Sequence, residues 1–141
     1  MMVKHLVSAM VITAILSCGQ NEPIANYEPK SPQEQALKNI LLAFQDGVNT
    51  RDSDKIGNLI HEKAAIMTGR DRKIISKAEY IKTLPQRLAE NPPVSLGKPK
   101  IAVSGDKAEV KIYVTRGDYK GLIVFNMTFD NNKWTIQSWK Y

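Results

Sequence analysis

The chain contains a single thiol, Cys18, which stands where a short apolar run near the N-terminus gives way to a polar segment. Lys4 precedes the run, which spans Leu6 to Leu16, and the small residue Ser17 follows it. A positive start, an apolar middle and a small residue before the cut are typical of a secretory signal peptide. The run is too short for a transmembrane helix, which needs about 20 apolar residues. A single cysteine also excludes an intramolecular disulfide and a zinc site built from several thiolates.

The residues Ile15-Leu16-Ser17-Cys18 resemble a bacterial lipobox, in which the cysteine thiol is acylated and becomes the first residue of the mature protein. The resemblance implies a signal peptide over residues 1–17 and a palmitate-type lipid anchor at Cys18. Two or more acyl chains give stable anchoring, since each buried methylene contributes about 0.8 kcal/mol. Gly19 stands where an inner-membrane retention signal has aspartate, so in a Gram-negative cell we expect the outer membrane, facing the periplasm. The alternatives are an ordinary signal peptide that contains a cysteine, or a buried thiol.

His61 is the only histidine after this leader, and it stands beside Glu62 where a second helix is expected to end. An imidazole can act as a general base. No second titratable group is spaced to orient it, so we favour a polar residue at a helix terminus. Asp46, Asp52 and Asp54 are expected to cap and solvate a turn, not to bind a metal. The sequence therefore predicts no metal and no cofactor.

Two polar side chains, Asn126 and Thr128, interrupt the apolar run from Leu122 to Phe129. They share one face of a strand, because successive side chains alternate between faces. If that face is concave, they are candidate polar groups of an apolar pocket. The full candidate set is Asp46, His61, Tyr80, Asn126 and Thr128. The favoured alternative puts the two polar residues on the solvated face and the larger apolar side chains in the core. Those side chains are Ile123, Phe125, Met127 and Phe129.

The aromatic residues late in the chain predict an interface. We assign Trp134 to the core together with Ile136. Trp139 and Tyr141 are out of phase with this pair, so we expect them on the outer face beside Tyr113. Exposed aromatic side chains there favour a homodimer or another protein contact, with Trp139 as its anchor. Cross-strand aromatic pairing within one sheet is the alternative.

The polar segment over residues 18–31 contains Pro23 and Pro29 and is expected to form a flexible tether. The domain is expected over residues 32–141, with helices first and strands after, which indicates an α+β architecture. The predicted helices cover residues 32–50, 53–60 and 77–91, with the third kinked or split at Pro85. The predicted strands cover residues 64–67, 73–75, 101–103, 110–114, 122–129 and 134–141.

This order of elements resembles the nuclear transport factor 2-like superfamily, also called SnoaL-like, over residues 33–141. The resemblance rests on residues 43–56, on the passage into the first strand at residues 59–66, and on the closing strand pattern of residues 132–136. It implies a cone-shaped α+β fold, in which a curved antiparallel sheet packs on three N-terminal helices and often leaves a pocket. Some members of the family are isomerases or cyclases, and many others bind or assemble.

The formal net charge is +6, but the basic residues are scattered among acids, so a nucleic-acid surface is not expected. We expect a membrane-anchored envelope domain that binds a small ligand or an envelope protein without catalysis. The alternative is a small isomerase- or cyclase-type enzyme that uses His61 or Asp46 as a base inside the cone.

Overall fold

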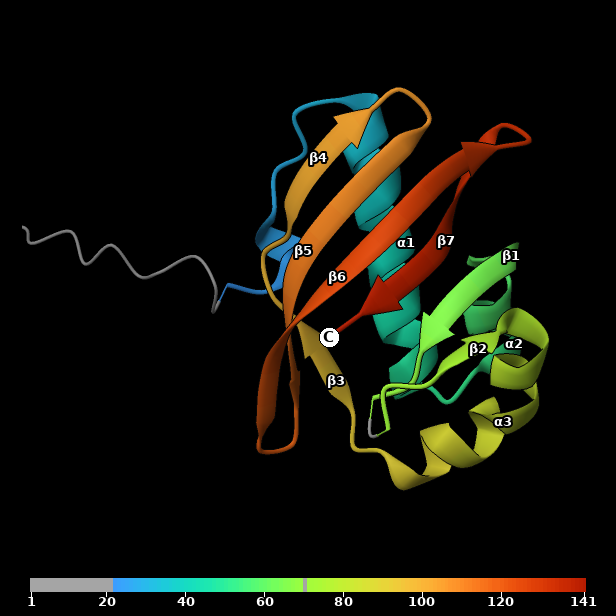
Figure 1. The fold of residues 1–141 in the computed structure, drawn as a ribbon. Coiled ribbons are helices and arrows are strands. Elements are labelled where there is room, and N and C mark those ends of the chain that lie inside the picture. The colour runs from blue at the N-terminus through green and yellow to red at the C-terminus, as the bar shows by residue number, and fades with distance from the viewer. Residues whose placement is uncertain (1–21, 70) are drawn as a thin grey trace, which may run out of the picture.

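The computed structural model describes residues 22–69 and 71–141 (Figure 1). Cys18 and the signal peptide expected over residues 1–17 lie outside the described residues. The helices are η2 (Ile24–Asn26), α1 (Pro32–Asn49), α2 (Ser53–Gly57) and α3 (Lys77–Glu90). The strands are β1 (Ile60–Met67), β2 (Ile74–Ser76), β3 (Val94–Leu96), β4 (Lys100–Ser104), β5 (Lys107–Arg116), β6 (Tyr119–Asp130) and β7 (Lys133–Lys140). In the described part of the chain, none of the helices has the length and apolar character needed to traverse a bilayer.

Each α-helix begins at a residue whose side chain caps it. The side chains of Ser31, Asp52 and Ser76 each accept a hydrogen bond, at 3.0–3.2 Å, from the backbone N–H three residues later. These bonds satisfy amide groups that have no partner within the first turn. The predicted starts of the helices are confirmed. The third helix is not split at Pro85, because Leu84 and the other buried residues of α3 hold it on the core along its length.

The second helix is shorter than predicted. It ends at Gly57, and β1 begins at Ile60 and runs for eight residues. The backbone after the helix is used for strand pairing: Ile60 pairs with Ile136 of β7, whose N–H donates to the carbonyl of Leu59 at 2.8 Å. His61 therefore lies in a strand, and its predicted place at a helix terminus is wrong.

The strands form one seven-stranded sheet in the order β2-β1-β7-β6-β5-β3, and β4 also pairs with β5. β1 and β7 are parallel, whereas the other pairs are antiparallel, so the sheet is mixed and not purely antiparallel as expected. Figure 1 shows the sheet curving around α1, with α2 and α3 beside β1 and β2. This arrangement confirms the predicted α+β cone.

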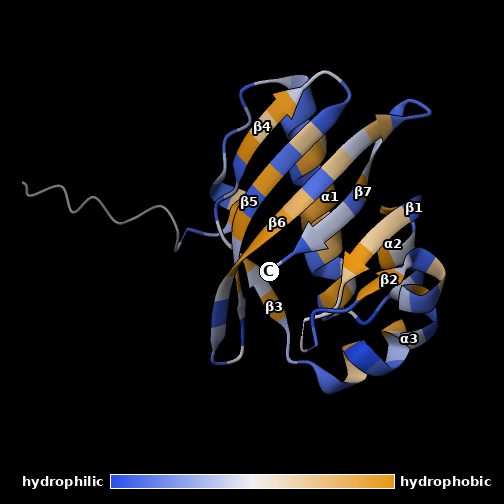
Figure 2. Ribbon diagram, viewed as in Figure 1, coloured by the Kyte–Doolittle hydropathy of each residue, from blue (hydrophilic) through white to orange (hydrophobic). Residues whose placement is uncertain are grey.

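The core lies between α1 and the inward face of the sheet. Figure 2 shows the alternation of hydrophilic and hydrophobic residues along β5 that assigns one face of the strand to this core. The largest side chains that are almost fully buried include Leu37, Leu41, Ile112, Phe125, Met127 and Ile136. Each such side chain contributes about 1.5–3 kcal/mol through burial. Trp134 and Ile136 are both buried, as predicted.

A bulge in β7 changes which of its side chains face inward. Ile136 and Ser138 pair with adjacent residues of β6, so Gln137 is an extra residue without a partner of its own. An extra residue reverses the alternation of faces beyond it. Trp139 therefore pairs with Phe125, faces the core and is only 5% exposed. The expectation that Trp139 lies on the outer face is wrong.

Residues 22–30 pack against the domain, where a flexible tether was expected. Ile24 is 1% exposed and belongs to the core. Lys38 of α1 donates to two backbone carbonyls of this segment, at 3.1 and 2.6 Å. The hydroxyl of Tyr27 donates to the carboxylate of Glu34 at 2.7 Å. The packed domain thus begins earlier than predicted, because an apolar side chain of the segment reaches the core.

Candidate functional site

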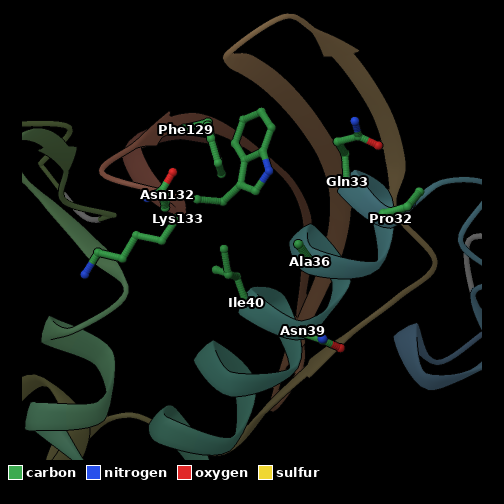
Figure 3. Close-up of a pocket in the computed structure, with 9 residues that line it drawn as sticks. Pro32, Gln33, Ala36, Asn39, Ile40, Phe129, Asn132 and Lys133 are labelled. Carbon is green, nitrogen blue, oxygen red and sulfur yellow. The ribbon is translucent and has the colours of Figure 1, made fainter.

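An open groove lies between the N-terminal half of α1 and the end of the β6–β7 hairpin (Figure 3). Its volume of about 510 Å³ is within the usual range for small-molecule sites. The residues that line it are Pro32, Gln33, Ala36, Asn39, Ile40, Phe129, Asn132, Lys133 and Trp134. Most of this lining is apolar, and its polar members are three amides and one lysine.

The helix supplies one long wall of the groove. Ala36 and Ile40 lie one turn apart, and residues four apart share a face of a helix. They lie beside the fully buried Leu37 and Leu41 and are themselves only partly buried. Ile40 is eight positions after Pro32, and a helix rises 1.5 Å per residue, so this wall is about 12 Å long.

Phe129 and Trp134 form the opposite wall. They are a cross-strand pair, with ring centroids 5.4 Å apart and ring planes at 54°. Asn131 and Asn132 connect the two strands with φ values of 51° and 62°. Two left-handed residues make the hairpin turn whose twist matches that of the strands, and asparagine tolerates this conformation. The turn thereby places Asn132 and Lys133 at the rim of the groove.

Phe129 faces inward and yet is open to solvent. It lies on the same face of β6 as Phe125 and Met127, which are each 1% exposed, but Phe129 is 41% exposed. The prediction that it completes the core is therefore wrong, because α1 leaves the groove uncovered at this end of the sheet. An aromatic side chain on an inward face that lacks cover is the defining feature of the site.

A histidine–carboxylate pair holds the hairpin turn against β1. His61 Nδ1 accepts the backbone N–H of Lys63 at 3.0 Å. The proton of a neutral ring is therefore on Nε2, which lies 3.4 Å from a carboxylate oxygen of Asp130. With both ring nitrogens engaged, His61 positions the turn beside Phe129 and does not itself line the groove.

Two more of the candidate pocket residues, Asp46 and Tyr80, do not line the groove. Asp46 is exposed and forms an ion pair with Lys55. Tyr80 is buried and packs edge-on against Trp139, with centroids 5.1 Å apart. Burial raises the pKa of the Tyr80 hydroxyl above its ordinary value. Neither side chain reaches the groove.

Asn126 and Thr128 lie on the outer face of the sheet, as the favoured alternative predicted, but Thr128 is only 5% exposed and is therefore not solvated as expected. The Asn126 amide donates to Ser138 Oγ at 3.2 Å, and Thr128 Oγ1 accepts from Lys107 Nζ at 2.9 Å. Both contacts join neighbouring strands across that face. Their role is to satisfy polar groups of the sheet, not to bind a ligand inside the cone.

The five candidate pocket residues do not converge on a cavity in the described part of the chain. A cluster of four aromatic rings fills the interior between α1, α3 and the sheet, with centroid distances of 5.1–5.9 Å. The cluster consists of Phe44, Tyr80, Phe125 and Trp139. Among residues 22–69 and 71–141, no three His, Cys, Asp or Glu side chains are grouped to hold a metal ion.

The three expected interface residues do not share a face. Tyr113 is partly exposed, and its ring lies 5.9 Å from the Lys120 ammonium. Trp139 is in the core. Tyr141 is partly buried with its ring near Gly69, and burial raises the pKa of its hydroxyl. The bulge in β7 separates these side chains, so the predicted aromatic patch does not form.

No protein-family model matches the chain. No curated protein matches it in sequence either. Several solved structures are similar in fold. An NTF2-like protein of unknown function from Shewanella baltica is 17% identical, with a TM-score of 0.64 over 79% of this chain and 94% of its own. A candidate calcium/calmodulin-dependent protein kinase II association domain from Xanthomonas campestris is 11% identical, with a TM-score of 0.69 over 85% and 92% of the two chains.

A candidate ketosteroid isomerase from Shewanella frigidimarina is 16% identical, with a TM-score of 0.62 over 74% of this chain and 94% of its own. Identities this low establish the fold and nothing about activity. The domain has the NTF2-like fold, which the sequence resemblance implied.

Proposed function

We propose that this chain is an exported lipoprotein, anchored through an acylated Cys18, whose NTF2-like domain binds a small ligand or an envelope protein without catalysis. The groove between α1 and the β6–β7 hairpin is the binding site. The observation that carries the binding role is Phe129, an inward-facing aromatic residue that is 41% exposed in the wall of this groove. Apolar surface of this kind is stabilised when a ligand removes it from water.

The chemistry of the lining favours binding over catalysis. A general acid or base must be within hydrogen-bond reach of the atom that it protonates or deprotonates. Lys133 is the only titratable residue among those that line the groove. The acid and the histidine considered as bases are paired elsewhere, Asp46 with Lys55 and His61 with Asp130.

The anchoring role is supported by the lipobox-like sequence that ends at Cys18. Glu22, where the described structure begins, is four positions after Cys18 in the sequence. A fully extended chain spans at most about 3.6 Å per residue, so this connection reaches no more than about 14 Å. A lipid on Cys18 would hold the domain close to the membrane surface.

Fractionation of cells that express the full chain tests the anchor. We expect the natural chain to incorporate labelled palmitate and to sediment with membranes. Cys18→Ser should carry no label and should either leave the membrane fraction or accumulate as the uncleaved precursor. Ser17→Ala is the matched control and should behave like the natural chain, because a small residue remains before the cysteine. A processed Cys18→Ser protein that stays with membranes would contradict the proposal.

Native mass spectrometry of the protein purified from its own envelope tests the binding role. Ala36→Phe fills the groove from α1, whereas Ala102→Phe adds the same ring at an exposed position of β4. We expect a bound ligand or partner on the natural chain and on Ala102→Phe, and its loss from Ala36→Phe. The same occupancy on all three proteins would rule out the groove as the site.

A further inference from the structure

We propose that the groove binds a fatty acid, with the aliphatic chain along α1 and the carboxylate beside Lys133. This inference rests on the proposed binding role of the groove and names the chemical class of its ligand.

The shape of the groove suits an extended chain. Pro32 and Gln33 lie at one end in Figure 3, Lys133 lies at the other, and Ala36 and Ile40 lie between them. The helical wall is about 12 Å long, because it spans two turns of α1. Facing it are the rings of Phe129 and Trp134. An unbranched chain laid in this groove would cover the exposed part of Phe129 along its length.

The polar end of the groove has the charge that a carboxylate requires. Lys133 is the one charged residue of the lining, and its side chain extends toward β1 in Figure 3. There the hydrogen bond from Lys77 and, to a lesser extent, the charge of Lys133 lower the pKa of the Glu62 carboxyl. Asp130, its cross-strand neighbour, pairs with His61, and Glu62 pairs with Lys77 at 2.7 Å. A ligand carboxylate at this end of the groove therefore meets the Lys133 cation, and the lining itself contains no acid that would repel it.

The first turn of α1 presents no free acid to the ligand either. Glu34 accepts hydrogen bonds from the Tyr27 hydroxyl and from the backbone N–H of Lys30, at 2.7 and 2.8 Å. These partners belong to the packed N-terminal segment, which does not line the groove. The formal charge of +6, which is +5 without Lys4 of the expected signal peptide, adds a favourable long-range field for an anionic ligand.

The two tryptophans of the chain allow a direct test with a brominated fatty acid, because bromine quenches indole fluorescence only at close range. Trp134 lines the groove, and Trp139 is five residues further along β7, about 16 Å away. The protein is the chain from Gly19 onward, which keeps every described residue. With 9,10-dibromostearate, we expect Trp139→Phe, which retains Trp134, to lose most of its fluorescence. Trp134→Phe should retain most of its fluorescence.

Calorimetric titrations with dodecanoate, dodecanol and dodecylamine test the head group. Lys133→Gln should weaken dodecanoate binding about two- to fivefold, the range for one exposed ion pair, and leave dodecanol binding unchanged. Lys82→Gln, at an exposed position of α3, is the matched control and should change neither. Ala36→Phe should abolish binding of dodecanoate and dodecanol, whereas Ala102→Phe should not. Thermal unfolding of each variant verifies that it is folded.

Three results would overturn the proposal: no quenching of Trp134, equal quenching of both tryptophans, or tighter binding of the amine than of the carboxylate. If the Trp134→Phe variant does not bind the fatty acid at all, the loss of binding itself shows that the ligand contacts residue 134. If fatty acids do not bind but Ala36→Phe dissociates a dimer seen by sedimentation, the groove is an interface between copies. In that case the fatty-acid inference fails, and the proposed binding role of the groove stands.

Discussion

The indole of Trp139 lies edge-on to the ring of Tyr80, with centroids 5.1 Å apart and ring planes at 81°. This contact joins β7 to α3 across the interior of the cone. It depends on the extra residue Gln137, which turns Trp139 toward the helices. Aromatic pairs of this geometry contribute about 0.5–1.5 kcal/mol beyond the burial of their area. Trp139 therefore stabilises the fold and is unavailable as the anchor of an interface.

Trp139→Ala is expected to lower the free energy of unfolding by about 3–5 kcal/mol, because it removes a buried indole and leaves a cavity. Tyr113→Ala, on the outer face of β5, should cost less than about 1 kcal/mol. Urea unfolding followed by circular dichroism measures both values. Similar costs for the two variants would mean that Trp139 is not part of the core.

Deletion of Gln137 should leave the domain folded, with Trp139 still in the core. Gln137 is the residue of β7 without a partner in β6, so its deletion brings Ile136, Ser138 and Trp139 into one regular alternation in which each keeps its present partner. Gln137→Ser keeps the residue count and should cost less than about 1 kcal/mol. Dispersion of amide signals in NMR spectra distinguishes the folded from the unfolded protein. An unfolded deletion variant would show that the bend at the bulge is itself needed to close the sheet.

Phe44→Ala and Ile112→Ala should each destabilise the protein by about 2–5 kcal/mol, because both side chains are buried under the sheet. His61→Ala should cost no more than about 1 kcal/mol, since it removes hydrogen bonds near the surface. Denaturant midpoints of the three variants give the comparison. A cost for His61→Ala that matches the core variants would mean that the turn at Asp130 depends on it far more than its geometry indicates.

Acid should weaken the packing of the N-terminal segment through Glu34. The backbone N–H of Lys30, followed by the Tyr27 hydroxyl, lowers the pKa of this carboxyl below its ordinary value. A lowered pKa in the folded state contributes stability that is present above the unfolded pKa of about 4.3 and is lost as the pH falls through the folded pKa. The cost of Glu34→Gln should therefore shrink between about pH 6 and about pH 3.

Glu28→Gln is the control for this prediction, because Glu28 is exposed and is not at a helix cap. Its effect on unfolding should stay small at every pH. The measurement is urea unfolding across the pH series for the natural chain and both variants. A cost of Glu34→Gln that does not change with pH would contradict the assignment.

Local signals in the sequence predict much of this fold. Ser31 and Ser76 mark helix starts because a cap acts within one turn, and alternation along β5 predicts its buried face because it depends on the strand alone. The bulge at Gln137 has no such signal, since it is defined by pairing with β6. His61 was misplaced for the same reason: pairing of β1 with a strand about 75 residues later decides where α2 ends.

The groove was missed because its signals are shared with the core. Ala36 and Ile40 widen the apolar stripe of α1, and Phe129 continues the apolar run of β6. Because these three side chains are apolar, the sequence predicts that each of them is buried in the core. Whether α1 covers Phe129 depends on how the helix crosses the sheet, which neither segment specifies alone. The binding site is thus a property of packing, not of a sequence motif.

The position of β7 has a consequence for the order in which the chain can fold during its synthesis. β7 follows every other described element in sequence, yet it lies between β1 and β6 in the sheet. A nascent chain that stops before Lys133 has β1–β2 and β3–β6 as two separate sheets, each with an unpaired edge. Such a chain cannot close its core, so folding must wait for β7. The domain therefore reaches its folded state only after β7 has been synthesised.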